Sequence, residues 1–240
     1  MWELYDELIS GIGGDIYVEE LICGLIWTMV RTNQGGVGLA MTTNVHAYPV
    51  QKRGYRGMEL KRAAESVRSW NLIEAGIGMA AINAFYNTPE RLEKLHAEQK
   101  RDGFCSMDIP HEGKNVCMVG ALKCPKGYFD SAASFSVFER DSVPGAFPDT
   151  AEEYILPKSD LAVITGSALV NKTMPRLLLL TKSGCPVITG PTTPMSETLL
   201  RHGAKRLAGL VITDPDGCRE MVCEGYNSSP YGFGRKFMLE

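Results

Sequence analysis

Residues 160–194 read DLAVITGSALVNKTMPRLLLLTKSGCPVITGPTTP, and this stretch decides the fold. Its apolar runs at 161–164 and 186–188 lack the polar alternation of a half-exposed strand, so we expect two strands buried on both faces. Between them, residues 173–180 predict a leucine-rich helix, which Gly184 terminates. Strand, helix and strand at this spacing predict a right-handed βαβ crossover in a parallel sheet.

The same kind of apolar run recurs around this crossover. Further strands are predicted at 115–119, 134–138 and 207–213. Together with the two strands above, they would form the parallel sheet of a Rossmann-like domain. In such sheets, ligands bind beyond the carboxyl ends of the strands.

The first half of the chain has a different pattern. We expect a β-hairpin from residues 16–31 and 37–43, followed by helices at 57–69, 71–87 and 88–101. The helix at 71–87 is rich in glycine and alanine, which lets a neighbouring backbone approach closely. The predicted class is therefore α/β, with an α+β domain at 1–113 and a Rossmann-like domain at 114–240.

Charge and hydropathy narrow the range of partners. Lys and Arg number 25 against 28 Asp and Glu, so the net charge is −3 and no basic excess favours nucleic acid or an anionic membrane. The start, MWELYDELISGIGGD, is acidic and amphipathic, unlike a signal peptide, and no apolar run approaches about 20 residues. We expect a cytoplasmic protein with a small-molecule or metal ligand, and homo-oligomerisation is left open.

Seven cysteines are an odd number in a chain too long to need disulfides, so reduced thiols are expected. No CxxC or HExxH motif is present. The sequence motifs alone therefore do not indicate a metal site.

Glycine, serine and threonine follow the two strands of the central crossover. Turns of this composition could open two helix N-termini toward one anionic ligand, with hydroxyl donors around it. The predicted ligand-binding residues are Gly120, Thr165, Gly166, Ser167, Asn171, Thr173, Gly190, Pro191, Thr192 and Thr193. The alternative is structural: the glycines serve tight turns, and Asn171 caps a helix. If the first interpretation holds, Gly166→Val should abolish binding and leave the fold mostly intact.

Two carboxylates are candidate acids or bases. Glu74 lies among small and apolar residues, where it is either a cleft-facing acid, base or metal ligand, or a solvent-facing or ion-paired side chain. Glu139 follows Gly120 by 19 residues, as does the ribose-binding acid of a dinucleotide fold, but residues 120–127 lack the G-x-G-x-x-G spacing. His46 and Cys124, both in predicted loops, are further candidate metal ligands.

Several blocks of the chain resemble a known family. They are SWNLIEAGIGMAAINA (69–84), VCMVG (116–120), DLAVITGSALVNKT (160–173), VITGPTTP (187–194) and the AG at 208–209. These blocks resemble an uncharacterised prokaryotic family labelled "putative heavy-metal chelation". The resemblance implies a domain similar to the N-terminal domain of enolase, then a Rossmann-like domain, and a site in the cleft between them. It also implies a heavy-metal ion or metal complex as ligand.

Three functions are compatible with these observations. The first is binding of a small anionic ligand or heavy-metal complex in the interdomain cleft, as metal chelation or chelate handling. The second is an enzyme acting on a nucleotide or pterin-like molecule there, with Glu74 or Glu139 as acid or base. The third is a structural or regulatory module, which the hydroxyl-rich turns disfavour. Whether the protein is an enzyme is left open.

Overall fold

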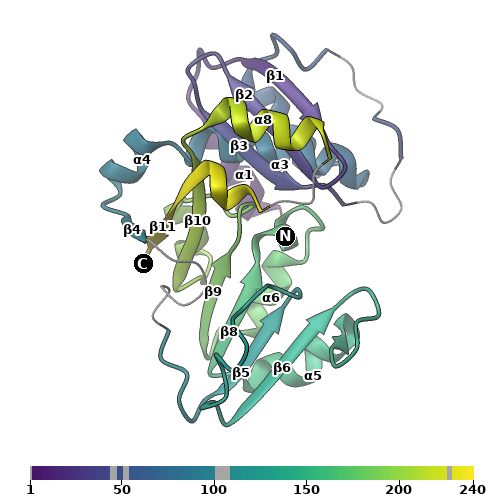
Figure 1. Cartoon of the computed structure of the whole chain (residues 1–240), viewed down its shortest axis with the longest axis vertical. Coiled ribbons are helices and arrows are strands. Elements are labelled where there is room, and N and C mark those ends of the chain that lie inside the picture. Colours follow the sequence, from purple (N-terminus) through teal and green to yellow (C-terminus); the bar gives the residue numbers. More distant parts are fainter. Residues whose placement is uncertain (1, 44–47, 51–53, 101–108, 226–228) are drawn as a thin grey trace.

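The computed structural model describes residues 2–43, 48–50, 54–100, 109–225 and 229–240. The chain forms a three-stranded sheet and an eight-stranded sheet (Figure 1). The strands are β1 Val18–Cys23, β2 Trp27–Thr32, β3 Val37–Met41, β4 Glu98–Lys100, β5 Asn115–Val119, β6 Ser134–Glu139, β7 Phe147–Pro148, β8 Leu161–Thr165, β9 Cys185–Thr189, β10 Arg206–Ile212 and β11 Gly234–Leu239.

Short and long helices connect these strands. The α-helices are α1 Glu3–Ser10, α2 Leu60–Ala64, α3 Leu72–Tyr86, α4 Pro89–Lys94, α5 Glu152–Ile155, α6 Met174–Leu180, α7 Glu197–Arg201 and α8 Pro215–Cys223. The 3₁₀ helices are η1 Glu65–Arg68, η3 Asp149–Ala151, η4 Leu156–Lys158, η5 Gly166–Leu169 and η6 Pro230–Phe233. None of the helices in the described ranges combines the length and the hydropathy that crossing a bilayer requires.

The eight-stranded sheet confirms the predicted α/β class. Its order is β4-β11-β10-β9-β8-β5-β6-β7, and the six strands from β10 to β7 are parallel. All five strands predicted in the second half are present. Numbered along the chain, the parallel strands run 3-2-1-4-5-6, the doubly wound order, and the direction of winding reverses between β5 and β8.

The predicted hairpin of 16–31 and 37–43 is present as β2 and β3, but its first arm is divided, because 18–23 form β1 and turn back to pair with β2 in the three-stranded sheet. Helix α3 covers one face, and α8 lies across the other (Figure 1). Helix α8 was not predicted from the sequence, although Asp214 caps it by accepting a hydrogen bond from the Gly217 amide. Its apolar residues Cys218, Met221 and Val222 pack on the sheet. The end of the chain thus returns to the sheet that the beginning forms.

The predicted helix at 88–101 is wrong over its second half. Helix α4 ends at Lys94, and His96 adopts a left-handed conformation with φ +52°. Residues 98–100 then form β4, which pairs with β11 in the large sheet. A partner more than 130 residues away overrides the local helical pattern here.

Helix α3 confirms the prediction that its small residues allow close approach. A β-carbon at Gly78 would lie 2.0 Å from the Val67 amide nitrogen, and one at Gly38 of β3 would lie 2.1 Å from the Ala80 carbonyl oxygen. Contacts this short are impossible for any residue with a side chain. The glycines therefore set the distance between α3 and its neighbours.

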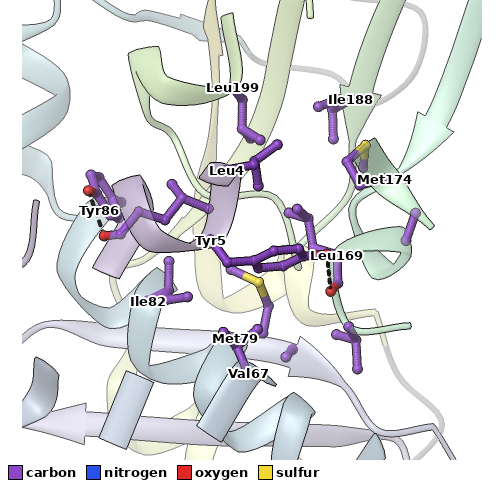
Figure 2. Close-up of a cluster of buried hydrophobic side chains, with 14 of the residues drawn as sticks. Leu4, Tyr5, Val67, Met79, Ile82, Tyr86, Leu169, Met174, Ile188 and Leu199 are labelled. Carbon is purple, nitrogen blue, oxygen red and sulfur yellow. Dashed lines mark hydrogen bonds between the residues drawn. The ribbon is translucent and has the colours of Figure 1, made fainter. Parts of the chain in front are cut away.

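One apolar core joins the two parts of the chain (Figure 2). Helix α1 packs its Leu4 and Tyr5 between α3 and the segment after β8, and the Tyr5 hydroxyl donates to the Leu169 carbonyl at 2.9 Å. The predicted division into two domains at residue 113 stays a prediction. Strand β4 precedes residue 113 but pairs with β11, and α8 follows residue 113 but packs on β1 and β2.

Candidate functional site

The loops after β5, β8 and β9 lie along the carboxyl edge of the parallel sheet, as the sequence predicted for its candidate ligand-binding residues. Gly120 and Thr165 are brought together there: Gly120 has φ +89°, and a β-carbon on it would lie 2.8 Å from the Thr165 methyl group. The Thr165 hydroxyl accepts a hydrogen bond from the Ser167 amide at 3.3 Å. Thr165 and Ser167 are half-buried.

The loop at 190–193 is closed, and this corrects part of the predicted geometry. Thr192 and Thr193 are only 2% and 0% exposed. The Thr192 hydroxyl accepts from the Met41 amide at 3.0 Å, so it anchors the first sheet. Asn83 of α3 and Asn87, which directly follows α3, donate to the Thr192 and Thr193 carbonyls, each at 2.9 Å.

The predicted pair of helix N-termini is absent from these described segments. Gly166 begins a 3₁₀ helix of four residues, and no helix begins at Gly190, because the next one, α7, starts at Glu197. Pro191 is half-buried beside Gly190. The hydroxyl and amide groups that looked like ligand donors in sequence are partly used by the protein itself. Ligand contact by these residues stays a prediction.

Gly166 has a packing role. A β-carbon on it would lie 2.6 Å from the Thr193 hydroxyl and 2.7 Å from the Thr193 amide nitrogen. The expectation that Gly166→Val leaves the fold mostly intact is therefore wrong, because a valine would separate the loops after β8 and β9.

Lys172 stands out beside these loops, and sequence reasoning missed it. It has a left-handed backbone with φ +66° and is half-buried. Its ammonium donates to the carbonyl oxygens of Ser69 at 2.5 Å and Val170 at 3.0 Å. Burial lowers the pKa of Lys172 to about 8. Nothing in the local pattern distinguishes this lysine, since its environment comes from η1 and α3, a hundred residues earlier.

Glu74 lies in the first turn of α3, close to this lysine in the hydrogen-bond network. Its carboxylate accepts from the Ser69 hydroxyl at 2.6 Å, and the Ser69 carbonyl accepts from Lys172. Ser69 therefore connects the predicted acid with the lysine. The alternative interpretation, a purely structural carboxylate, is compatible with the same contact. The role of Glu74 stays a prediction.

Two exposed aromatic side chains lie next to Ser69 or in contact with its neighbour: Trp70 follows Ser69 in the chain, and Tyr48 packs on Trp70. Tyr48 and Trp70 are 51% and 73% exposed, and their rings meet edge to face with centroids 5.2 Å apart. Asn71 holds this arrangement, because its amide donates to the Tyr48 carbonyl at 3.2 Å while its side-chain oxygen caps α3. The junction site, as we name it, consists of Ser69, Trp70, Glu74, Lys172 and Tyr48.

The other candidates are dispersed. Asn171 accepts from the Thr173 amide at 3.1 Å and the Thr173 hydroxyl at 2.7 Å, so its side chain is bonded locally. The N-cap of α6 is Thr173, so the alternative that Asn171 caps a helix is wrong. Cys124 packs against the apolar cluster on the outer face of β5. His46 lies outside the described residues. In the described ranges, no three His, Cys, Asp or Glu side chains converge as metal ligands would.

Family models match most of the chain. One, DUF4213, covers residues 5–86, and another, DUF364, covers residues 105–238; both are described as "putative heavy-metal chelation". The chain belongs to the DUF364 family. This confirms the resemblance found in the sequence. The family description is general and specifies neither a metal nor a ligand.

Solved structures agree with this assignment. A DUF364 protein of unknown function from Desulfitobacterium hafniense is 33% identical with a TM-score of 0.90, covering 100% of this chain and 98% of that one. A second, from Pyrococcus horikoshii, is 23% identical with a TM-score of 0.83 over 99% and 98%, and shows the shared fold. The uncharacterized protein MJ0500 of Methanocaldococcus jannaschii is 25% identical over 75% of this chain and 71% of its own.

Proposed function

We propose that the protein binds a small anionic organic ligand, free or as its heavy-metal complex, at the junction site. The observation that carries this proposal is the environment of Lys172. A half-buried ammonium is unfavourable unless an anion compensates it. Within the described residues, no carboxylate lies within 4 Å of the Lys172 nitrogen, and the two carbonyls take only two of its three N–H donors.

The surroundings of Lys172 suggest what else the ligand carries. Trp70 and Tyr48 present ring surface to solvent beside Ser69, and such surfaces bind flat or apolar groups at little entropic cost. Ser167 lies five residues before Lys172, and its hydroxyl donates to the Met41 sulfur at 3.8 Å, a weak bond that a better acceptor would replace. A planar or partly apolar anion fits this combination of groups.

The family description, heavy-metal chelation, is compatible with the junction site if the metal ion is bound as part of a metal–ligand complex. Heavy-metal ions in proteins are held by several His, Cys or carboxylate side chains. The described residues offer no such group of three. A chelate brings its own donor atoms and presents carboxylates outward, so a cation and hydroxyl donors suffice to hold it.

The proposal is tested with three probes: citrate, Ni²⁺, and the nickel–citrate complex. Calorimetric titration of the full chain should show binding of citrate or its complex, but not of Ni²⁺ alone. Lys172→Gln should weaken that binding at least about tenfold, because it removes a charge-assisted hydrogen bond. Trp70 fluorescence should report the same event, and Trp70→Phe should remove the signal.

Lys205→Gln is the matched control, since Lys205 is exposed at the opposite edge of the sheet, before β10. It should bind the probes as the unmodified protein does. Native mass spectrometry with elemental analysis of protein purified without chelators provides an independent readout. Stoichiometric binding of Ni²⁺ alone that survives Lys172→Gln would contradict the proposal, as would a clean mass together with no response to any probe.

A further inference from the structure

A second place on the carboxyl edge has the chemistry of a ligand site and is independent of the proposed function. The winding of the sheet reverses between β5 and β8. Doubly wound sheets bind their ligands in the crevice outside this reversal, because the neighbouring loops diverge there. Gly120 ends β5 on one side of that point, and Glu139 ends the neighbouring strand β6.

The segment after β5, which binds a diphosphate in dinucleotide-binding folds, differs in this protein. Residues 121–133, all of which the structure describes, form turns and no helix. The row of helical N–H groups that would bind a pyrophosphate is therefore missing. The first amide after Gly120, that of Ala121, instead donates to the carboxylate of Glu139. The Glu139 carboxylate thus uses the first amide that a phosphate could otherwise bind.

An acidic residue is present where dinucleotide-binding folds recognise ribose. Glu139 is half-buried at the end of the second strand of the order, and its other oxygen accepts from the Arg140 amide at 3.1 Å. A carboxylate has about four acceptor positions, and these two amides use two. The amides hold the side chain in place and leave acceptor positions for two neighbouring hydroxyls. The Thr165 methyl group fills the space that a side chain on Gly120 would take, so the accessible part of this edge is formed by the exposed Ala121 and the half-buried Glu139.

We propose that the edge formed by Gly120, Ala121 and Glu139 binds a ribonucleoside that lacks a 5′-phosphate, with Glu139 accepting hydrogen bonds from the ribose hydroxyls. A 5′-phosphate would be repelled by the Glu139 carboxylate and would find no helix N-terminus to offset that repulsion. Selectivity for nucleosides over nucleotides follows from the same two features. The site lies on β5 and β6, whereas the junction site lies on α3 and the segment after β8.

The test is calorimetric titration of the full chain with adenosine, guanosine, cytidine and uridine, and with their 5′-monophosphates. At least one nucleoside should bind at millimolar or lower concentration, and its monophosphate should bind at least about tenfold more weakly. The corresponding 2′-deoxynucleoside should also lose about tenfold, because one bond to the carboxylate is removed. In Glu139→Gln, nucleoside affinity should fall and the difference between the ribo and deoxy forms should shrink.

Asp160→Asn is the matched control. Asp160 accepts from the Asn115 amide at 2.8 Å and so connects β8 to β5 at the opposite, amino-terminal edge. Asp160→Asn should alter thermal stability but leave nucleoside binding unchanged. Lys172→Gln should also leave nucleoside binding unchanged. The inference is overturned if no nucleoside binds, if a monophosphate binds more tightly than its nucleoside, or if Glu139→Gln binds as well as the unmodified protein.

Discussion

Two loops on the same edge of the parallel sheet begin alike and end differently. Each follows a buried strand with a left-handed glycine, Gly120 at φ +89° and Gly190 at φ +109°. The residues after Gly190 are buried beneath α3 and β3, with Thr193 fully inaccessible, whereas Ala121 after Gly120 is exposed. The difference shows that a glycine-rich turn after a strand identifies a position in the fold, and that the neighbouring elements decide whether it is open to a ligand.

Gly78→Ala should have the largest effect, because it moves the helix that closes the 190–193 loop. The added β-carbon would meet the Val67 backbone at 2.0 Å, and backbone cannot move aside as a flexible side chain can. We expect a loss of about 3 kcal/mol or more in the free energy of unfolding, measured by urea denaturation.

Gly76→Ala is its control on the same helix. A β-carbon there meets nothing closer than 3.9 Å, so the gain in helix propensity should leave stability unchanged or raise it by about 1 kcal/mol. Equal losses in both variants would contradict the close-packing explanation.

Asn87→Ala tests the polar contacts that close the loop. The Asn87 side chain donates to the Thr193 and Leu210 carbonyls and accepts from the Met195 amide, and it is 2% exposed. Leaving those groups unpaired should lower stability by about 2–3 kcal/mol in chemical denaturation. Loss of the exposed Asn115 amide in Asn115→Ala should have a smaller effect.

The junction site, beside these two loops, is tested through the pH dependence of Lys172. Its folded pKa, about 8, is lowered from 10.5, so the unfolded chain binds more protons between these values. The contribution of Lys172 to stability should therefore rise as pH increases from about 8 toward 10.5. Buried thiols such as Cys117 oppose this rise because their pKa is raised, so the contribution of Lys172 is measured as the difference between the unmodified protein and Lys172→Met in denaturant titrations across that range. Affinity for citrate should fall over the same range as the ammonium is lost, and an increase would contradict the role of the ammonium.

The smallest effect is expected from the ion pairs that follow the closed loop. Glu7 of α1 accepts from His202 at 2.9 Å and Arg201 at 3.0 Å, and these hydrogen bonds lower its pKa. Its stabilising contribution is present above 4.5, the ordinary value, and is lost as pH falls through the folded pKa. The melting temperature of Glu7→Gln should be slightly lower than that of the unmodified protein at neutral pH. The two melting temperatures should be equal below the folded pKa of Glu7.

Much of the fold was predictable because its signals are local. An apolar run such as 161–164 indicates a strand buried on both faces, and small residues spaced along α3 indicate close packing whatever the partner. Residues 98–100 show the limit of this reasoning. Their sequence continues a helical pattern, and only the pairing of β4 with β11 makes them a strand.

The candidate site was predictable only in part. The sequence placed Gly120, Thr165 and Ser167 on one edge, because parallel strands end together there. It could not show that the Thr192 hydroxyl would accept a hydrogen bond from the amide of Met41, which is 151 residues away in the chain. It also could not distinguish Lys172, whose half-burial depends on Ser69.

The sequence by itself determined the class of fold, the positions of five parallel strands along the chain and the family, because these depend on residues close together in the chain. Only the tertiary structure decided which polar groups remain available to a ligand. Availability depends on what packs over each loop, and the covering elements α3, β3 and α1 all precede the parallel sheet they cover. Contacts between segments so far apart leave no periodic or local signature in the sequence.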